Sequence, residues 1–171
     1  MIGICAALFF AARTQAATIN LTETLTGSQE TPPNASPATG TGTETLNTAT
    51  DLFSWTVDWS GLSGPFTAAH FHFAPPGVAG PVQIDLSAVG TLTLSADKLS
   101  GSSVGSTTLT ATQVSQILAG DWYVNVHSSV LPAGEIRGQL AAVPEPAGTA
   151  LAGLALIWIG LGRRVKSVRR R

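Results

Sequence analysis

Ser54-Trp55-Thr56-Val57-Asp58-Trp59 is the stretch that decides the fold. Large apolar residues alternate in it with small or charged ones, and successive side chains of a β-strand point to opposite faces of the sheet. Trp55, Val57 and Trp59 are therefore predicted to face a hydrophobic core, while the residues between them face away from it. A strand with one apolar and one polar face is typical of an antiparallel sheet.

Similar runs recur along the chain and are separated by Gly, Pro, Ser and Asn. This pattern predicts an all-β domain, and we expect an antiparallel, Greek-key-like β-sandwich. One short helix should interrupt the strands near residues 110–118, because Thr110 and Gln113 have the spacing of a capping box and Gly120 suits the position after a helix end. The strands are predicted over residues 18–26, 40–48, 51–59, 66–73, 81–86, 89–95, 104–109, 121–128 and 134–141.

The last 29 residues form three consecutive segments of different character. Val143-Pro144-Glu145-Pro146 is followed by an apolar run over 147–162 and by a basic tail over 163–171. A helix over the apolar run would be about 24 Å long, slightly less than the roughly 30 Å hydrocarbon core of a bilayer. We therefore expect a short transmembrane helix with its basic tail in the cytoplasm. A permanent anchor and a buried helix are the alternatives, although a buried helix would be amphipathic.

The N-terminus also predicts export. Residues 1–17 combine an apolar run with small residues where a signal peptidase would cleave, so we interpret them as a signal peptide. Cys5 lies within this segment, and the mature chain would therefore contain no cysteine and no disulfide. The remaining domain, residues 18–142, is large enough for a single hydrophobic core.

The predicted mature domain is strongly acidic, although the whole chain has a net charge of −1. Between residues 18 and 142, Lys98 and Arg137 are the only basic residues and oppose nine acidic ones, which gives a net charge of −7. Such a charge disfavours nucleic acid and anionic lipid headgroups as partners. It is compatible with cation binding, and also with an ordinary solvated acidic surface.

The three histidines of the chain all fall on the polar faces of predicted strands. In residues 69–73 (AHFHF), alternation turns the phenylalanines inward, so His70 and His72 should project together on the outer face. In residues 122–127 (WYVNVH), the tryptophan and the valines should face inward and His127 outward. Two histidines at positions i and i+2 can chelate one metal ion, and a third would complete three of the ligands that zinc or copper requires.

The strand predicted over 134–141 adds further polar groups to this region. It follows His127 through a short turn, and because strands joined by short connections usually pair, we expect the two strands to be antiparallel neighbours. We expect Glu135 to join the histidines, Arg137 to flank them, and Asp58, Glu135 or water to supply a fourth ligand. Two alternatives remain: the histidine strands never meet, or these residues form a hydrogen-bonded structural network.

Four blocks of sequence resemble the CHRD domain: residues 27–33 (GSQETPP), 59–72 (WSGLSGPFTAAHFH), 80–82 (GPV), and 123–127 (YVNVH) leading to 132–139 (PAGEIRGQ). The resemblance covers the whole predicted mature domain. It implies an all-β extracellular module without established catalytic activity. The H-x-H strand is also similar to the copper-ligand strand of Cu/Zn superoxide dismutase. However, three histidines and no mature cysteine cannot supply that enzyme's two-metal site or its disulfide.

The C-terminal segment resembles the PEP-CTERM sorting signal of Gram-negative bacteria. This resemblance implies that the protein is exported, anchored through residues 147–162, and then processed by an exosortase. After processing, it would lie at the cell surface or outside the cell.

Two functions from different classes are therefore predicted. The first is a non-enzymatic module of the cell envelope or extracellular matrix, with no cofactor and with exosortase, the secretion machinery and extracellular polysaccharide as partners. Ser128 and Ser129 adjoin His127, but neighbouring strand residues point to opposite faces, so no nucleophile is paired with a base. The second is a metal-binding protein or metal-dependent enzyme that holds copper or zinc at His70, His72 and His127.

Overall fold

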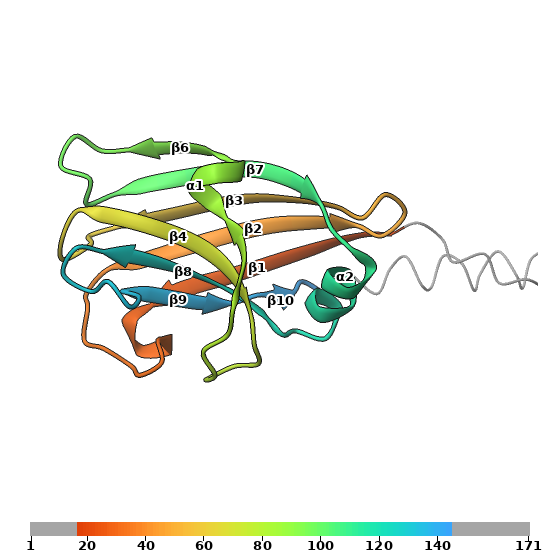
Figure 1. The fold of residues 1–171 in the computed structure, drawn as a ribbon, viewed down its shortest axis with the longest axis horizontal. Coiled ribbons are helices and arrows are strands. Elements are labelled where there is room, and N and C mark those ends of the chain that lie inside the picture. The colour runs from red at the N-terminus through yellow and green to blue at the C-terminus, as the bar shows by residue number, and fades with distance from the viewer. Residues whose placement is uncertain (1–16, 145–171) are drawn as a thin grey trace, which may run out of the picture.

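A computed structural model describes residues 17–144 (Figure 1). The strands are β1 (Thr18–Thr26), β2 (Thr39–Asn47), β3 (Leu52–Ser60), β4 (Phe66–Phe73), β5 (Val82–Asp85), β6 (Thr91–Leu94), β7 (Gly101–Thr108), β8 (Trp122–Ser128), β9 (Ile136–Gln139) and β10 (Ala141–Ala142). The helices are α1 (Leu86–Val89), α2 (Ala111–Leu118) and the 3-10 turn η1 (Gly27–Gln29). Every predicted strand is present, and the last is divided into β9 and β10.

The predicted export segments lie almost entirely outside the described residues. These are residues 1–16 of the signal peptide, and Glu145 and Pro146 with the span and the basic tail that follow them. Within residues 17–144, no helix has the length and apolar character needed to cross a membrane.

The strands form one continuous antiparallel sheet, which corrects the expectation of a sandwich of separate sheets. Their order is β5-β4-β8-β9-β1-β2-β3-β7-β6, with β10 beside β1. The ring of Phe53 on β3 nevertheless lies 5.2 Å from that of Phe71 on β4 and 6.0 Å from that of Trp122 on β8, measured between ring centroids. Because β3 is not a neighbour of β4 or β8 in the sheet, the sheet must curl until its two halves enclose a core.

The core contains the residues that alternation assigned to it. Trp55, Val57 and Trp59 are all buried, which confirms the predicted facing of β3. The inward residues of β8, Trp122, Val124 and Val126, are buried as well. The indole Nε1 of Trp55 donates to Ser103 Oγ at 3.1 Å, so burial of this ring leaves its one polar group satisfied.

The two helices occupy connections between strands. Helix α2 begins with the predicted capping box: Thr110 Oγ1 accepts from the Gln113 backbone N–H, and Gln113 Oε1 accepts from that of Thr110. Gly120 follows the helix with a φ of +80°, a conformation that favours glycine. Helix α1 was not predicted. It is a single turn capped by Asp85, and it joins β5 to β6, the strands at the two edges of the sheet.

The polar face of β4, β8 and β9 is covered by two loops. Arg137 Nη1 donates to Thr31 Oγ1 in the first loop (residues 30–38) and to the Val78 carbonyl in the second (residues 74–81). Gln139 Nε2 donates to the Ala74 carbonyl in the second loop. Tyr123, Asn125 and Arg137 are consequently only 2–4% exposed. Alternation correctly placed these residues on the side of the sheet that faces away from the core. It assigned that side to solvent, but the two loops bury it.

Candidate metal centre

The three histidines lie together on this covered face. His70 and His72 are on β4 and His127 is on β8, its antiparallel neighbour (Figure 1). One ring nitrogen from each histidine lies within 4.8 Å of those from the other two. Zinc–nitrogen bonds of about 2.0–2.1 Å would place such nitrogens roughly 3.3–4.2 Å apart. Small rotations of the rings are therefore sufficient to bring all three to one ion.

Backbone carbonyls fix the proton positions of two of these rings. His72 Nδ1 lies 2.8 Å from the Gly80 carbonyl oxygen, and His127 Nδ1 lies 3.1 Å from that of Pro132. Because a carbonyl can only accept, each Nδ1 must carry the hydrogen, and the Nε2 of the neutral ring keeps a lone pair. This arrangement, in which the non-ligating nitrogen donates to a carbonyl, is typical of histidine ligands of metals.

The remaining ring nitrogens are also informative. His70 Nδ1 lies 3.1 Å from His127 Nε2 and donates to its lone pair in the metal-free protein, so binding of both rings to one ion would replace this hydrogen bond by metal–nitrogen bonds. His72 Nε2 is buried and has no hydrogen-bond partner. An unpaired buried acceptor is unusual in a folded protein, and a bound cation would satisfy it.

Burial also favours the protonation state that binds metals. It lowers the pKa of all three histidines below the ordinary value, and the charge of Asp85 opposes this effect at His70. The Gly80 and Pro132 carbonyls oppose it at His72 and His127. This lowering favours the neutral rings that metal ligation requires.

Two of the expected accessory residues are not part of this group. Glu135 Oε1 instead accepts from Ser36 Oγ at 2.6 Å and from the Ser63 backbone N–H at 2.7 Å. Strand β9 begins only at the next residue, so the strand alternation on which the prediction rested does not apply to Glu135. Asp58 lies on the exposed face of β3, paired with Thr41 and Ser102.

Arg137 does flank the centre, and it does so through an aromatic ring. The ring of Tyr123 is stacked on that of His72, with 4.9 Å between centroids and 8° between planes. The guanidinium carbon of Arg137 lies 3.4 Å from the centroid of the Tyr123 ring, a cation–π contact. Tyr123 Oη also accepts from the Gly80 backbone N–H. Tyr123 and Arg137 therefore hold His72 in position.

Sequence reasoning missed two further polar residues at the centre, Glu30 and Asn125. Both are buried, and both carry an oxygen without a partner, Glu30 Oε1 and Asn125 Oδ1. Burial raises the pKa of Glu30 to about 7, against the lowering effects of the Thr31 backbone, Arg137 and Asn125. Alternation could have placed Asn125 beside the histidines. No periodicity could place Glu30, which lies in a loop.

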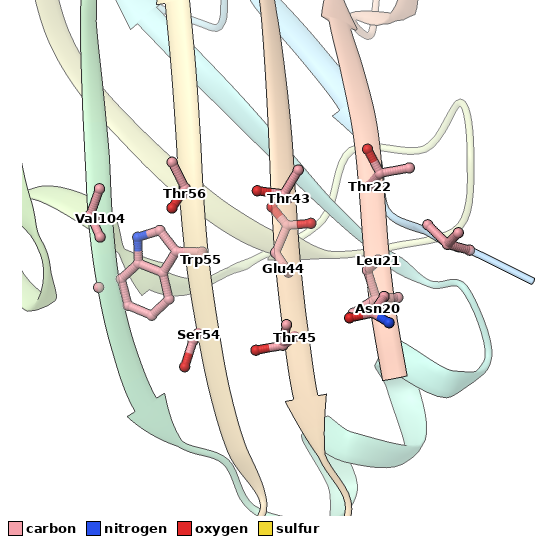
Figure 2. Close-up of a pocket in the computed structure, with 12 residues that line it drawn as sticks. Asn20, Leu21, Thr22, Thr43, Glu44, Thr45, Ser54, Trp55, Thr56 and Val104 are labelled. Carbon is pink, nitrogen blue, oxygen red and sulfur yellow. The ribbon is translucent and has the colours of Figure 1, made fainter. Parts of the chain in front are cut away.

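A shallow groove of about 580 Å³ lies on the outer face of β1, β2 and β3, away from the histidines. Figure 2 shows rows of small polar side chains across these strands, such as Thr22, Thr43 and Thr56, which are paired in register. Val143, just after β10, also lines the groove. Exposed side chains of this face alternate with core residues along each strand, as alternation predicts.

A curled antiparallel sheet whose covered face gathers three histidines defines this protein as an all-β module with a candidate metal centre. The CHRD domain family model matches residues 21–140, and the chain belongs to this family. CHRD domains are typically extracellular or secreted. Comparison with curated proteins and with solved structures gave no match.

Proposed function

We propose that this protein is an exported CHRD module that binds one transition-metal ion through His70, His72 and His127. The observation that carries the proposal is the meeting of three ring nitrogens within 4.8 Å, two of them from rings whose other nitrogen is held by a carbonyl. Imidazole ligands suit zinc and copper. Three protein ligands would leave a further coordination position for water or a small ligand.

Metal titration of the purified protein tests this proposal. We expect one equivalent of Zn²⁺ or Cu²⁺ to bind. His72→Ala should weaken binding by roughly 100-fold or more, since loss of a residue that only hydrogen-bonds a metal ligand already lowers metal affinity by about 10–100-fold. Asp58→Ala is the matched control, because it removes an acidic group from the opposite side of the molecule and should leave the affinity unchanged. Equal affinities of the parent and His72→Ala would refute the site.

The proposed export rests on the family and on the two terminal segments. CHRD domains are typically extracellular or secreted, and the terminal sequences have the character of a signal peptide and of a sorting signal. We expect the protein from its native host to have lost the tail at or near residues 143–146 after processing by an exosortase. Intact-mass measurement checks this, and a dominant species that retains Arg169, Arg170 and Arg171 would contradict it.

A second candidate function is non-enzymatic interaction with the cell surface or matrix. The groove in Figure 2 favours it, because its rows of hydroxyl groups offer hydrogen bonds to an extracellular polysaccharide. Retention of the protein on polysaccharide purified from its own matrix tests this function. It should be lost when Thr43, in the middle of the groove, is replaced by Lys, and an unchanged retention would argue against the groove.

A further inference from the structure

Three buried polar atoms without partners lie beside the metal centre: His72 Nε2, Asn125 Oδ1 and Glu30 Oε1. Their residues are 8%, 4% and 8% exposed, respectively. Buried polar groups are normally hydrogen-bonded, so three unpaired atoms from neighbouring side chains require a physical explanation.

Asn125 neighbours both of the other residues through its side chain. On β8 it is paired with His70 of β4 on one side and with Arg137 of β9 on the other. The Asn125 side chain is close enough to both groups to affect their pKa values, lowering that of Glu30 and raising that of His72 against the larger effects of burial. The Glu30 carboxyl packs against Gly134, where a Cβ atom would come within 2.7 Å of Glu30 Oε1.

The donors and acceptors at these positions permit two arrangements. His72 Nε2 can only accept, because Nδ1 carries the ring hydrogen. When Glu30 is protonated, its O–H can donate to Asn125 Oδ1, and Asn125 Nδ2 can then donate to His72 Nε2. When Glu30 is ionised it can only accept, so Asn125 Nδ2 must turn to Glu30. His72 Nε2 then faces Asn125 Oδ1, and two lone pairs meet with no hydrogen between them.

We propose that the Asn125 amide is a two-position relay that couples the protonation of Glu30 to the availability of His72 for a metal ion. This inference rests on the proposed metal-binding function. With Glu30 protonated, the amide blocks His72 Nε2. With Glu30 ionised, His72 Nε2 is free. A cation beside it would satisfy the facing lone pairs of His72 Nε2 and Asn125 Oδ1. Binding of the ion therefore releases the Glu30 proton to solvent.

The charges around Glu30 place this exchange near neutral pH. Burial raises the pKa of Glu30 to about 7, and the Arg137 guanidinium from β9 limits that rise. The titratable rings on the other side of Asn125 are His72 and His70 of β4 and His127 of β8, and burial lowers the pKa of each. Burial therefore shifts the pKa of Glu30 upwards and the pKa values of the three histidines downwards.

Zinc titration of the full chain between pH 6 and pH 8 tests the relay. In Glu30→Gln, the new amide donates permanently to Asn125 Oδ1 and keeps Asn125 Nδ2 on His72. We expect zinc affinity at pH 8 to fall roughly 10–100-fold, the range for outer groups of a metal site. Calorimetry in buffers of different ionisation enthalpy should also show one fewer proton released per ion at pH 6. Glu135→Gln is the matched control, since it changes another buried carboxyl that bonds Ser36 and Ser63.

A second variant and a metal-free measurement separate the possible failures. Asn125→Ala removes the relay, so its zinc affinity at pH 6 should equal or exceed that of the parent. In the metal-free parent, the ¹⁵N shift of His72 Nε2 should follow a titration near pH 7 that is absent in Glu30→Gln. If the parent binds zinc but releases as many protons per ion as Glu30→Gln, the relay is overturned and the proposed metal site stands. An Nε2 shift that is flat near pH 7 would overturn it whatever zinc does, whereas zinc binding that survives His72→Ala would overturn the proposed function itself.

Discussion

Replacement of Trp122 by Ala is expected to lower the free energy of unfolding by about 3–5 kcal/mol, the usual cost of removing a large core side chain. The ring is fully buried and lies 6.0 Å from Phe53 and 6.3 Å from Phe71, measured between centroids, so it packs against both halves of the curled sheet. Because a small domain is stable by only about 5–15 kcal/mol, the variant should be close to unfolding.

Urea unfolding followed by circular dichroism measures this effect. Leu118→Ala is the control, since it removes a large apolar side chain that is 52% exposed on α2 and should change stability by no more than about 0.5 kcal/mol. A Trp122→Ala protein as stable as its parent would show that the two halves of the sheet do not depend on this ring for their packing.

Replacement of Glu23 by Gln is expected to have the opposite effect. It should raise the free energy of unfolding above neutral pH. Glu23 on β1 and Glu44 on β2 both point into the core, at 5% and 2% exposure. Burial raises the pKa of Glu23 to about 7, and burial with the charge of Glu23 raises that of Glu44 to about 11. Gly42 makes room for the pair, because a side chain there would collide with Glu23.

The direction of the pH dependence follows from these raised values. Both carboxyls are protonated in folded and unfolded chains below about pH 4.5, so this pair destabilises the folded state least there. As pH rises, the unfolded chain ionises first. The folded state therefore loses stability through pH 7, where Glu23 loses its proton, and continues to lose it towards pH 11 because of Glu44. Glutamine cannot ionise, and Glu23→Gln should be more stable than the parent by roughly 3 kcal/mol at pH 8.

Unfolding in urea at pH 4.5, 6 and 8 checks this prediction. The difference between Glu23→Gln and the parent should shrink towards zero at the lowest pH, and Glu30 contributes equally to both proteins. Asp58→Asn, which changes an exposed carboxyl on the same curled sheet, should show no comparable trend. A stabilisation that is the same at all three pH values would mean that ionisation of the pair is not its cause.

The sequence predicted local structure well because alternation is a local property. Trp55 and Trp59 had to share a face, and His70 and His72 had to share the other, whatever the strands paired with. Pairing itself is long-range, and for this reason one curled sheet could not be distinguished from two separate sheets. The position of Glu30 likewise depends on a loop that folds across β8, and local periodicity carries no information about that contact.

The charge of a residue was the least reliable basis for predicting whether it is buried. Glu23 shares the parity of Leu21 and Leu25 on β1, so alternation alone would have placed it inside the core. It was nevertheless counted among solvated acids, because buried carboxyls are rare. Glu135 shows the opposite error: the alternation of a strand was extended to a residue that precedes β9. Residue type and strand phase have to be considered together. At Glu23 and Glu44 the two criteria disagree, and these are the unusual carboxyls of the core.

The single turn of α1 bears on how this protein behaves among copies of itself. Unpaired edges of a β-sheet are templates on which neighbouring chains can add strands and begin aggregation. Here the edge strands β5 and β6 have four residues each, and α1 joins one directly to the other. Edges so short offer few free backbone groups to another chain. Such short edges should limit the addition of strands from other copies of this protein.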